Sequence, residues 1–143
     1  MHTIIFSKLK EYFEQSYSKY DIVYAILFGT AATKYFRTDS DIDIAVRFSD
    51  DIDEDGRLSR VSDIIYDLEA LFKRSVDVID ALSTPPALRY EIFANGKLIF
   101  CRDREKYVED KTTAIMLYLD FKYVEDFHFR GIFDAVAGSK KSD

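Results

Sequence analysis

The chain has 143 residues, of which 48% are hydrophobic and 15% aromatic, a composition typical of a folded protein. Its net charge of -6 disfavours broad electrostatic binding to nucleic acid or to an anionic membrane surface. A single cysteine, Cys101, excludes an intramolecular disulfide, and no apolar run reaches the ~20 residues that cross a bilayer. We therefore expect one soluble, cytoplasmic domain spanning residues 1–143.

The hydrophobic pattern predicts helices and strands that alternate along the chain. Apolar residues at three- and four-residue spacing predict helices over 3–18, over a stripe from Leu58 to Phe72, and from the prolines at 85–86 to Asn95. Short apolar runs predict strands over 22–28, 41–48, 75–81 and 97–101. The fold class expected from this order is α/β (α+β), with a small mixed sheet flanked by helices.

The C-terminal part, from about residue 103 to 133, has a helical pattern, either continuous or broken, and residues 137–143 are expected to form a flexible tail. The helical segment is unusually aromatic. Its aromatic residues are Tyr118, Phe121, Tyr123, Phe127, Phe129 and Phe133. Packing in the core is the first explanation for them, and a face that binds a partner is the other.

Two acidic residues stand at the start of the second predicted strand. Residues i and i+2 of a strand point to the same face and lie roughly 6.5 to 7 Å apart, so Asp41 and Asp43 would present two carboxylates side by side. Like charges this close repel each other unless a cation lies between them, and hard oxygen ligands favour magnesium or manganese over zinc. The alternative is an exposed strand end whose aspartates face water.

Gly29 and Thr30 follow the first predicted strand. A glycine at this point lets the backbone approach a ligand, and the amides that open the next turn would point toward an anion. The alternative is an ordinary turn in which Thr30 caps a short helix. An anion-binding turn beside a cation site would together suit a metal-bound nucleoside triphosphate.

A third carboxylate, that of Asp77, lies between two valines in the third predicted strand. An acid in such a setting is costly to bury without a partner. If this strand pairs with the strand at 41–48, Asp77 could act as a further metal ligand or as the general base for an attacking hydroxyl. On an edge strand it would simply face solvent. Asp80 points to the other face and is the weaker candidate.

Gly-Thr at 29–30, Asp-x-Asp at 41–43 and the later strand aspartate together resemble the DNA polymerase beta-type nucleotidyltransferase superfamily. The similarity covers about residues 22–101. Within the superfamily, the chain is similar to the minimal nucleotidyltransferase (MNT) proteins, which pair with HEPN proteins as toxin–antitoxin modules. The resemblance implies that Gly29 and Thr30 hold the triphosphate of ATP. It also implies that Asp41, Asp43 and Asp77 are both the magnesium ligands and the catalytic residues.

The chain departs from the common family pattern after Gly29 and Thr30. Ala32 fits the pattern, but Thr33 and Lys34 stand where arginine and glycine are common. We expect Lys34 or Arg37 to supply the positive charge for the phosphates as a point charge in place of the arginine.

The resemblance further implies a magnesium-dependent transfer of AMP from ATP to a tyrosine hydroxyl of a cognate HEPN ribonuclease toxin, with this chain as the antitoxin. The alternative is an antitoxin that neutralises its partner by stable binding without catalysis. Transfer to a small molecule is a third possibility, which is less favoured because such enzymes generally carry an added domain.

An acidic loop at 49–56 imitates part of a calcium-binding loop. Asp51, Asp53, Asp55 and Gly56 match the first half of an EF-hand, but Ser62 stands where a bidentate glutamate is required. We interpret the loop as solvated carboxylates placed favourably before a helix N-terminus.

Overall fold

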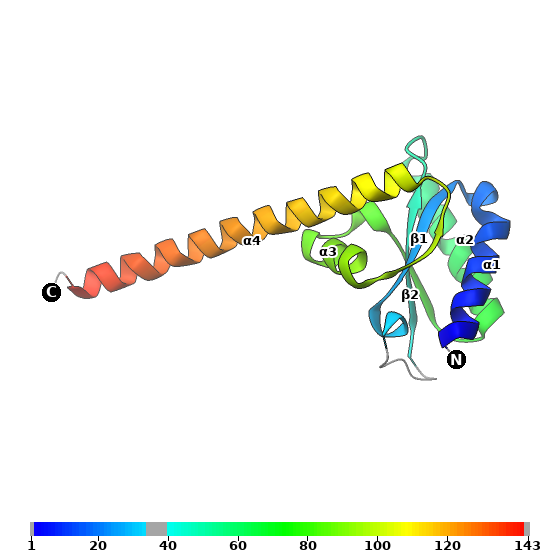
Figure 1. Cartoon of the computed structure of the whole chain (residues 1–143), viewed down its shortest axis with the longest axis horizontal. Coiled ribbons are helices and arrows are strands. Elements are labelled where there is room, and N and C mark those ends of the chain that lie inside the picture. Colours follow the sequence, from blue (N-terminus) through cyan, green and yellow to red (C-terminus); the bar gives the residue numbers. More distant parts are fainter. Residues whose placement is uncertain (1, 34–39, 142–143) are drawn as a thin grey trace.

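The computed structural model describes residues 2–33 and 40–141, which form a four-stranded sheet with helices on both faces (Figure 1). The strands are β1 (Ile22–Phe28), β2 (Ile42–Phe48), β3 (Val76–Asp80) and β4 (Lys97–Cys101). The helices are α1 (His2–Tyr20), α2 (Glu54–Phe72), α3 (Pro86–Asn95) and α4 (Arg104–Lys141), with short 3-10 helices η1 (Gly29–Ala32) and η2 (Ala81–Ser83). The predicted α+β class is confirmed.

The sheet is mixed, with the strand order β3-β2-β1-β4. β1 runs antiparallel to both β2 and β4, whereas β2 and β3 are parallel and are joined through α2. This topology places the beginnings of β2 and β3 side by side, next to the end of β1. β3 and β4 are the two edge strands of the sheet.

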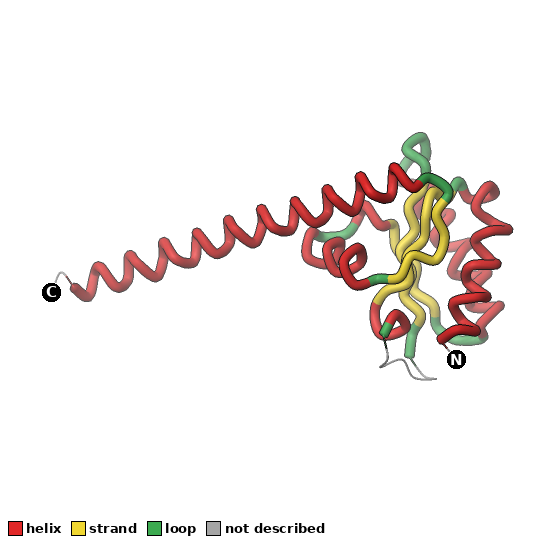
Figure 2. The backbone as a smooth tube through the Cα atoms, in the orientation of Figure 1, coloured by secondary structure: helices red, strands yellow, loops and turns green. Residues whose placement is uncertain are grey.

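Helices cover the sheet in two layers (Figure 2). α1 and α2 pack on one face, where residues such as Phe13 and Leu68 meet Ile42 and Ile44 of β2. α3 and the start of α4 pack on the other face, which includes Ala45. Because successive strand residues point to opposite faces, Asp43 shares the α3/α4 face with Ala45.

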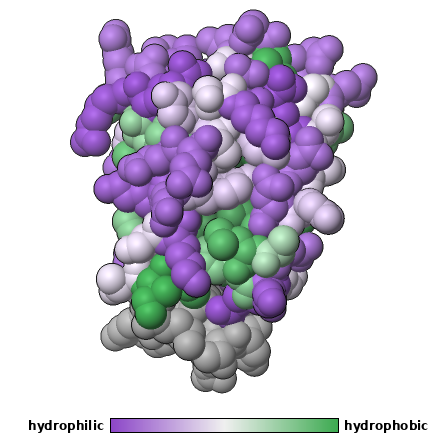
Figure 3. Space-filling view, turned by 90° about the vertical axis from the view of Figure 1, so that its right-hand side faces the viewer, coloured by the Kyte–Doolittle hydropathy of each residue, from purple (hydrophilic) through white to green (hydrophobic). Residues whose placement is uncertain are grey.

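The outward side of the α1/α2 layer is mostly hydrophilic, with a smaller apolar area toward one end (Figure 3).

The start of α2 explains the acidic loop that precedes it. Asp53 is the N-cap residue, and its Oδ1 accepts a hydrogen bond of 2.7 Å from the backbone N–H of Gly56. Glu54 and Asp55 occupy the first turn, where negative charge is favourable. The interpretation of this loop as a helix start is therefore confirmed.

α4 is a continuous helix of 38 residues that begins against the sheet and then projects away from the rest of the fold (Figure 1). Ala114 is buried, but Phe121 is 49% exposed, Tyr123 72% and Phe127 68%. The first explanation, core packing, is therefore wrong for these three aromatic residues. Tyr118 is half-buried and stacks on Tyr90, with ring centroids 4.2 Å apart.

The structure continues α4 to Lys141, into the segment 137–143 that was expected to be a tail. No helix among the described residues combines the length and the apolar character needed to cross a membrane.

Candidate active site

Asp43 and Asp77 face each other across the parallel pair of β2 and β3, where they are register partners. Neighbouring strands lie about 4.8 Å apart and register partners point to the same face, so both carboxylates project on the α3/α4 side of the sheet. Their neighbours Ile42, Val76 and Val78 are buried in the α1/α2 core. The structure therefore brings the third predicted carboxylate beside the Asp-x-Asp pair.

Asp41 lies immediately before β2 and is exposed. Two hydrogen bonds fix the backbone around it. Arg74 Nη2 donates to the carbonyl oxygen of Ser40 at 2.5 Å, and the N–H of Ile42 donates to the carbonyl oxygen of Ser75 at 3.2 Å. Sequence reasoning missed Arg74 as a positioning residue. The sequence shows only a basic residue directly before the predicted strand that carries Asp77. This pattern does not indicate a hydrogen bond to Ser40.

The surroundings of Asp43 disfavour the ionised form of its carboxyl group. Burial raises the pKa of this carboxyl above its ordinary value, and the negative charges of Asp77 and then Asp41 raise it further. Asp43 is half-buried, whereas Asp77 is exposed. The fold therefore holds a partly desolvated carboxylate beside two others.

Gly29 opens η1 directly after β1, and its φ of +70° lies in the left-handed region that favours glycine. A Cβ atom at this position would collide with the carboxylate of Asp43. The glycine therefore lets the turn after β1 pass close to Asp43.

The other predicted phosphate-binding residues are only partly described. Thr30 is exposed within η1. The N-cap residue of η1 is Phe28 and makes no side-chain capping hydrogen bond, so the alternative in which Thr30 is the cap does not hold. Lys34 and Arg37 lie outside the described residues.

The donor set fits magnesium. Carboxylate oxygens are the ligands that this ion prefers, and the raised pKa of Asp43 marks negative charge that a divalent cation would neutralise. Among residues 2–33 and 40–141, no three acidic, histidine or cysteine side chains already surround one metal position. The assignment of Asp41, Asp43 and Asp77 as ligands stays a prediction.

Asp80, the weaker candidate, has a structural role in the fold. Its Oδ2 pairs with Arg57 Nε at 2.7 Å, and its Oδ1 accepts a hydrogen bond of 3.1 Å from the N–H of Leu82, which caps η2. These bonds engage the side chain at the far end of β3 from Asp77.

A sequence model of the family described as "Polymerase beta, Nucleotidyltransferase" matches residues 7–105. The chain belongs to this polymerase beta nucleotidyltransferase family. The match includes all three aspartates and Gly29, and it confirms the resemblance seen in the sequence. No match was found among the curated proteins.

Several solved structures with a similar fold are toxin–antitoxin complexes. A toxin–antitoxin with AMP-PNP has a TM-score of 0.68 at 18% identity, covering 87% of this chain and 98% of that one. The MntA–HepT toxin–antitoxin gives a TM-score of 0.63 at 18% identity, with 89% and 98% covered. A tri-AMPylated Shewanella oneidensis HEPN toxin in complex with its MNT antitoxin gives 0.64 at 17% identity, with 93% and 99% covered. At these identities, the likeness shows that this nucleotidyltransferase shares their fold.

Proposed function

We propose that this chain is a magnesium-dependent nucleotidyltransferase that transfers AMP from ATP to a tyrosine hydroxyl of a cognate HEPN toxin, and that it acts as the antitoxin. The observation that carries the proposal is the pairing of Asp43 with Asp77 beside the turn at Gly29. Membership in the nucleotidyltransferase family supports the reaction type. The similar fold of an MNT antitoxin found with an AMPylated HEPN toxin supports the acceptor.

In this reaction, the tyrosine oxygen attacks the α-phosphorus of ATP, and the bond from that phosphorus to the oxygen bridging the β-phosphate breaks. Pyrophosphate leaves with the electron pair of that bond. Asp77 is the more exposed member of its register pair, so we assign to it the acceptance of the hydroxyl proton.

Asp41, Asp43 and Asp77 would hold the metal. Bound magnesium supplies positive charge that neutralises the phosphate oxygens and the departing pyrophosphate. The backbone at Gly29 and Thr30 would hold the triphosphate, because the glycine leaves that side of Asp43 free of a side chain. We assign Lys34 to the same triphosphate from the sequence pattern.

A second candidate function, neutralisation by stable binding alone, is favoured by the exposed apolar surface of α4. Leu117, Phe121 and Val124 recur at spacings of four and three residues and are 42–60% exposed. Tyr123 and Phe127 lie outside this row and are exposed as well. A helix with apolar residues on several sides is ordinarily covered by other protein, so we assign α4 to binding of the toxin.

The two candidates are separated by ATP labelled at the α-phosphate, incubated with magnesium, this chain and the HEPN protein encoded beside it. We expect label on the HEPN protein. Asp43→Asn should still bind that protein but should not label it, whereas the matched variant Asp55→Asn, in the exposed first turn of α2, should label it normally. Full neutralisation of the toxin by Asp43→Asn, without label, would establish binding alone.

A further inference from the structure

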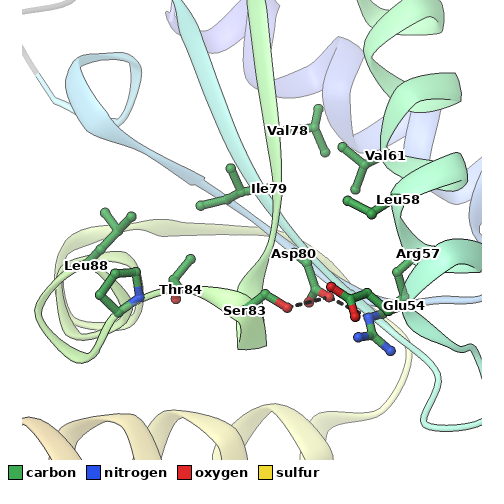
Figure 4. Close-up of a pocket in the computed structure, with 11 residues that line it drawn as sticks. Glu54, Arg57, Leu58, Val61, Val78, Ile79, Asp80, Ser83, Thr84 and Leu88 are labelled. Atoms are coloured by element: carbon green, nitrogen blue, oxygen red, sulfur yellow. Dashed lines mark hydrogen bonds and ion pairs between the residues drawn. The ribbon is translucent and has the colours of Figure 1, made fainter.

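A groove runs along the open edge of β3 (Figure 4). It encloses about 400 Å³ between the first half of α2, the end of β3 and the start of α3. Its apolar lining includes Leu58 and Val61 of α2, Val78 and Ile79 of β3, and Leu88 of α3. The ion pair between Arg57 and Asp80 lies at its polar end.

Two leucines that line the groove are exposed. Leu58 belongs to the apolar stripe of α2, yet it is 59% exposed, while Ile64 and Leu68 of the same stripe are fully buried. Leu88 is 39% exposed on the opposite wall. The groove is therefore an apolar surface that no described part of the chain covers.

The backbone of β3 also has hydrogen-bonding groups directed toward this groove. In a parallel ladder, alternate residues of a strand bond to its neighbour, and the N–H of Ile42 donates to the carbonyl oxygen of Ser75. Val76 therefore points its backbone groups outward, and its N–H indeed bonds to the Glu69 side chain at 3.2 Å. The same alternation directs the N–H and C=O of Val78 to the open edge.

The groove is continuous with the candidate site along one strand. Asp77 immediately precedes Val78, and a strand rises about 3.3 Å per residue, so the groove begins within one or two residues of the carboxylate. Ile79 points to the same face as Asp77 and lines the groove. A chain bound along this edge would thus pass from the groove to the carboxylate without leaving β3.

We propose that this β3-edge groove docks the acceptor segment of the partner protein, which rests on the function proposed above. The occupant is an extended peptide stretch that adds a strand to β3 through the outward groups of Val78. It places one apolar side chain between Leu58 and Leu88, and it presents its tyrosine hydroxyl to Asp77. Backbone hydrogen bonds from strand addition supply affinity, and the apolar pocket supplies specificity for one peptide segment.

The first test compares Leu58→Asp and Leu88→Asp with Leu71→Asp, which changes a leucine that is 42% exposed near the other end of α2. The groove variants should raise the KM for the HEPN protein at least about tenfold, as expected for loss of an apolar anchor, and should leave the KM for ATP unchanged. Leu71→Asp should leave both constants unchanged. Equal KM values for the HEPN protein in all three variants would overturn the proposed docking site.

The second test measures amide hydrogen exchange of this chain with and without the HEPN protein, and it does not depend on transfer. The amide of Val78 should become protected when the partner binds. Partner binding that protects α4 and leaves Val78 unprotected would overturn the groove but keep the proposed partner. If the Val78 amide is protected at high concentration of this chain alone, the β3 edge binds a second copy of this chain, and docking of the HEPN segment is overturned. If the HEPN protein does not bind at all, the proposed function and the docking site are both rejected.

Discussion

Asp43 and Asp77 lie side by side because β2 and β3 are parallel neighbours, although all of α2 separates them in the sequence. The sheet fixes both backbones, so the two side chains stay on the same face at neighbouring positions. Burial is the largest cause of the raised pKa of Asp43, and the charges of Asp77 and Asp41 raise that pKa further. Such an arrangement stabilises a bound cation at the expense of the metal-free protein.

Asp43→Asn should therefore abolish AMP transfer and, without metal, increase the free energy of unfolding at neutral pH. The amide keeps the shape of the side chain and removes the charge that Asp77 and Asp41 oppose. We expect transfer to fall at least about 100-fold. Urea unfolding with chelator present measures the stability, and a less stable Asp43→Asn protein would contradict the repulsion.

Gly29→Ala should impair both the fold and the site. The left-handed backbone at this position costs about 1–2 kcal/mol for a residue with a Cβ atom, and that atom would also displace the carboxylate of Asp43. Gly131→Ala is the matched control, because a Cβ atom there meets nothing within 4 Å. Urea unfolding and AMP transfer should both decline for Gly29→Ala alone. Unchanged transfer by Gly29→Ala would show that the turn does not need this close approach.

A buried polar network should control how α4 is anchored to the sheet. Asp110 of α4 accepts hydrogen bonds from Arg47 Nε at 3.0 Å and from the Tyr24 hydroxyl at 2.8 Å. Asp110→Ala leaves the buried Arg47 guanidinium with less negative charge near it and should cost about 3 kcal/mol. Tyr24→Phe removes only one hydrogen bond and should cost about 1 kcal/mol. Chemical unfolding curves compare the two, and equal small effects would contradict this network.

Alkaline pH should destabilise the packing of α1 on α2. Burial and the 2.7 Å hydrogen bond to Asp67 raise the pKa of Tyr20 from 10.0 to about 12. The folded protein thus favours the neutral phenol, so this stabilisation is complete below pH 10 and is lost as the pH rises toward 12. Complete loss of this stabilisation should lower the free energy of unfolding by about 3 kcal/mol.

The measurement is urea unfolding at increasing pH, for the unaltered chain and for two variants. Tyr20→Phe should show a shallower fall of stability above pH 10. Tyr66→Phe, at a position 77% exposed, should fall as the unaltered chain does. Identical slopes for all three proteins would rule out Tyr20 as the cause.

Local features of this fold could be predicted from the sequence because short-range rules determine them. The strand at 22–28 and the helix from Pro86 to Asn95 have the predicted bounds, since apolar runs and proline or glycine punctuation act over a few residues. The sequence places Asp77 beside Asp43 only if the two strands that carry them pair with each other. No local pattern decides which strands pair.

Features that depend on distant partners could not be predicted. The bonds from Arg47 and Tyr24 to Asp110 join three elements, and no single segment carries a signal for them. Periodicity likewise includes Leu58 in the apolar stripe of α2 although the residue is exposed, because it reports a helix face and not how far the covering layer extends. The exposure of Phe121, Tyr123 and Phe127 on α4 could not be predicted for the same reason.

The position of bound manganese tests most directly whether Asp43 and Asp77 form a metal site for nucleotide. Manganese replaces magnesium at oxygen ligands, and its paramagnetism broadens the nuclear magnetic resonance signals of nearby residues. With a nonhydrolysable ATP analogue present, we predict the strongest broadening at Gly29, Asp43 and Asp77, and its loss in Asp43→Asn. Broadening confined to the acidic loop at 50–55, and unchanged by Asp43→Asn, would contradict a catalytic metal site between β2 and β3.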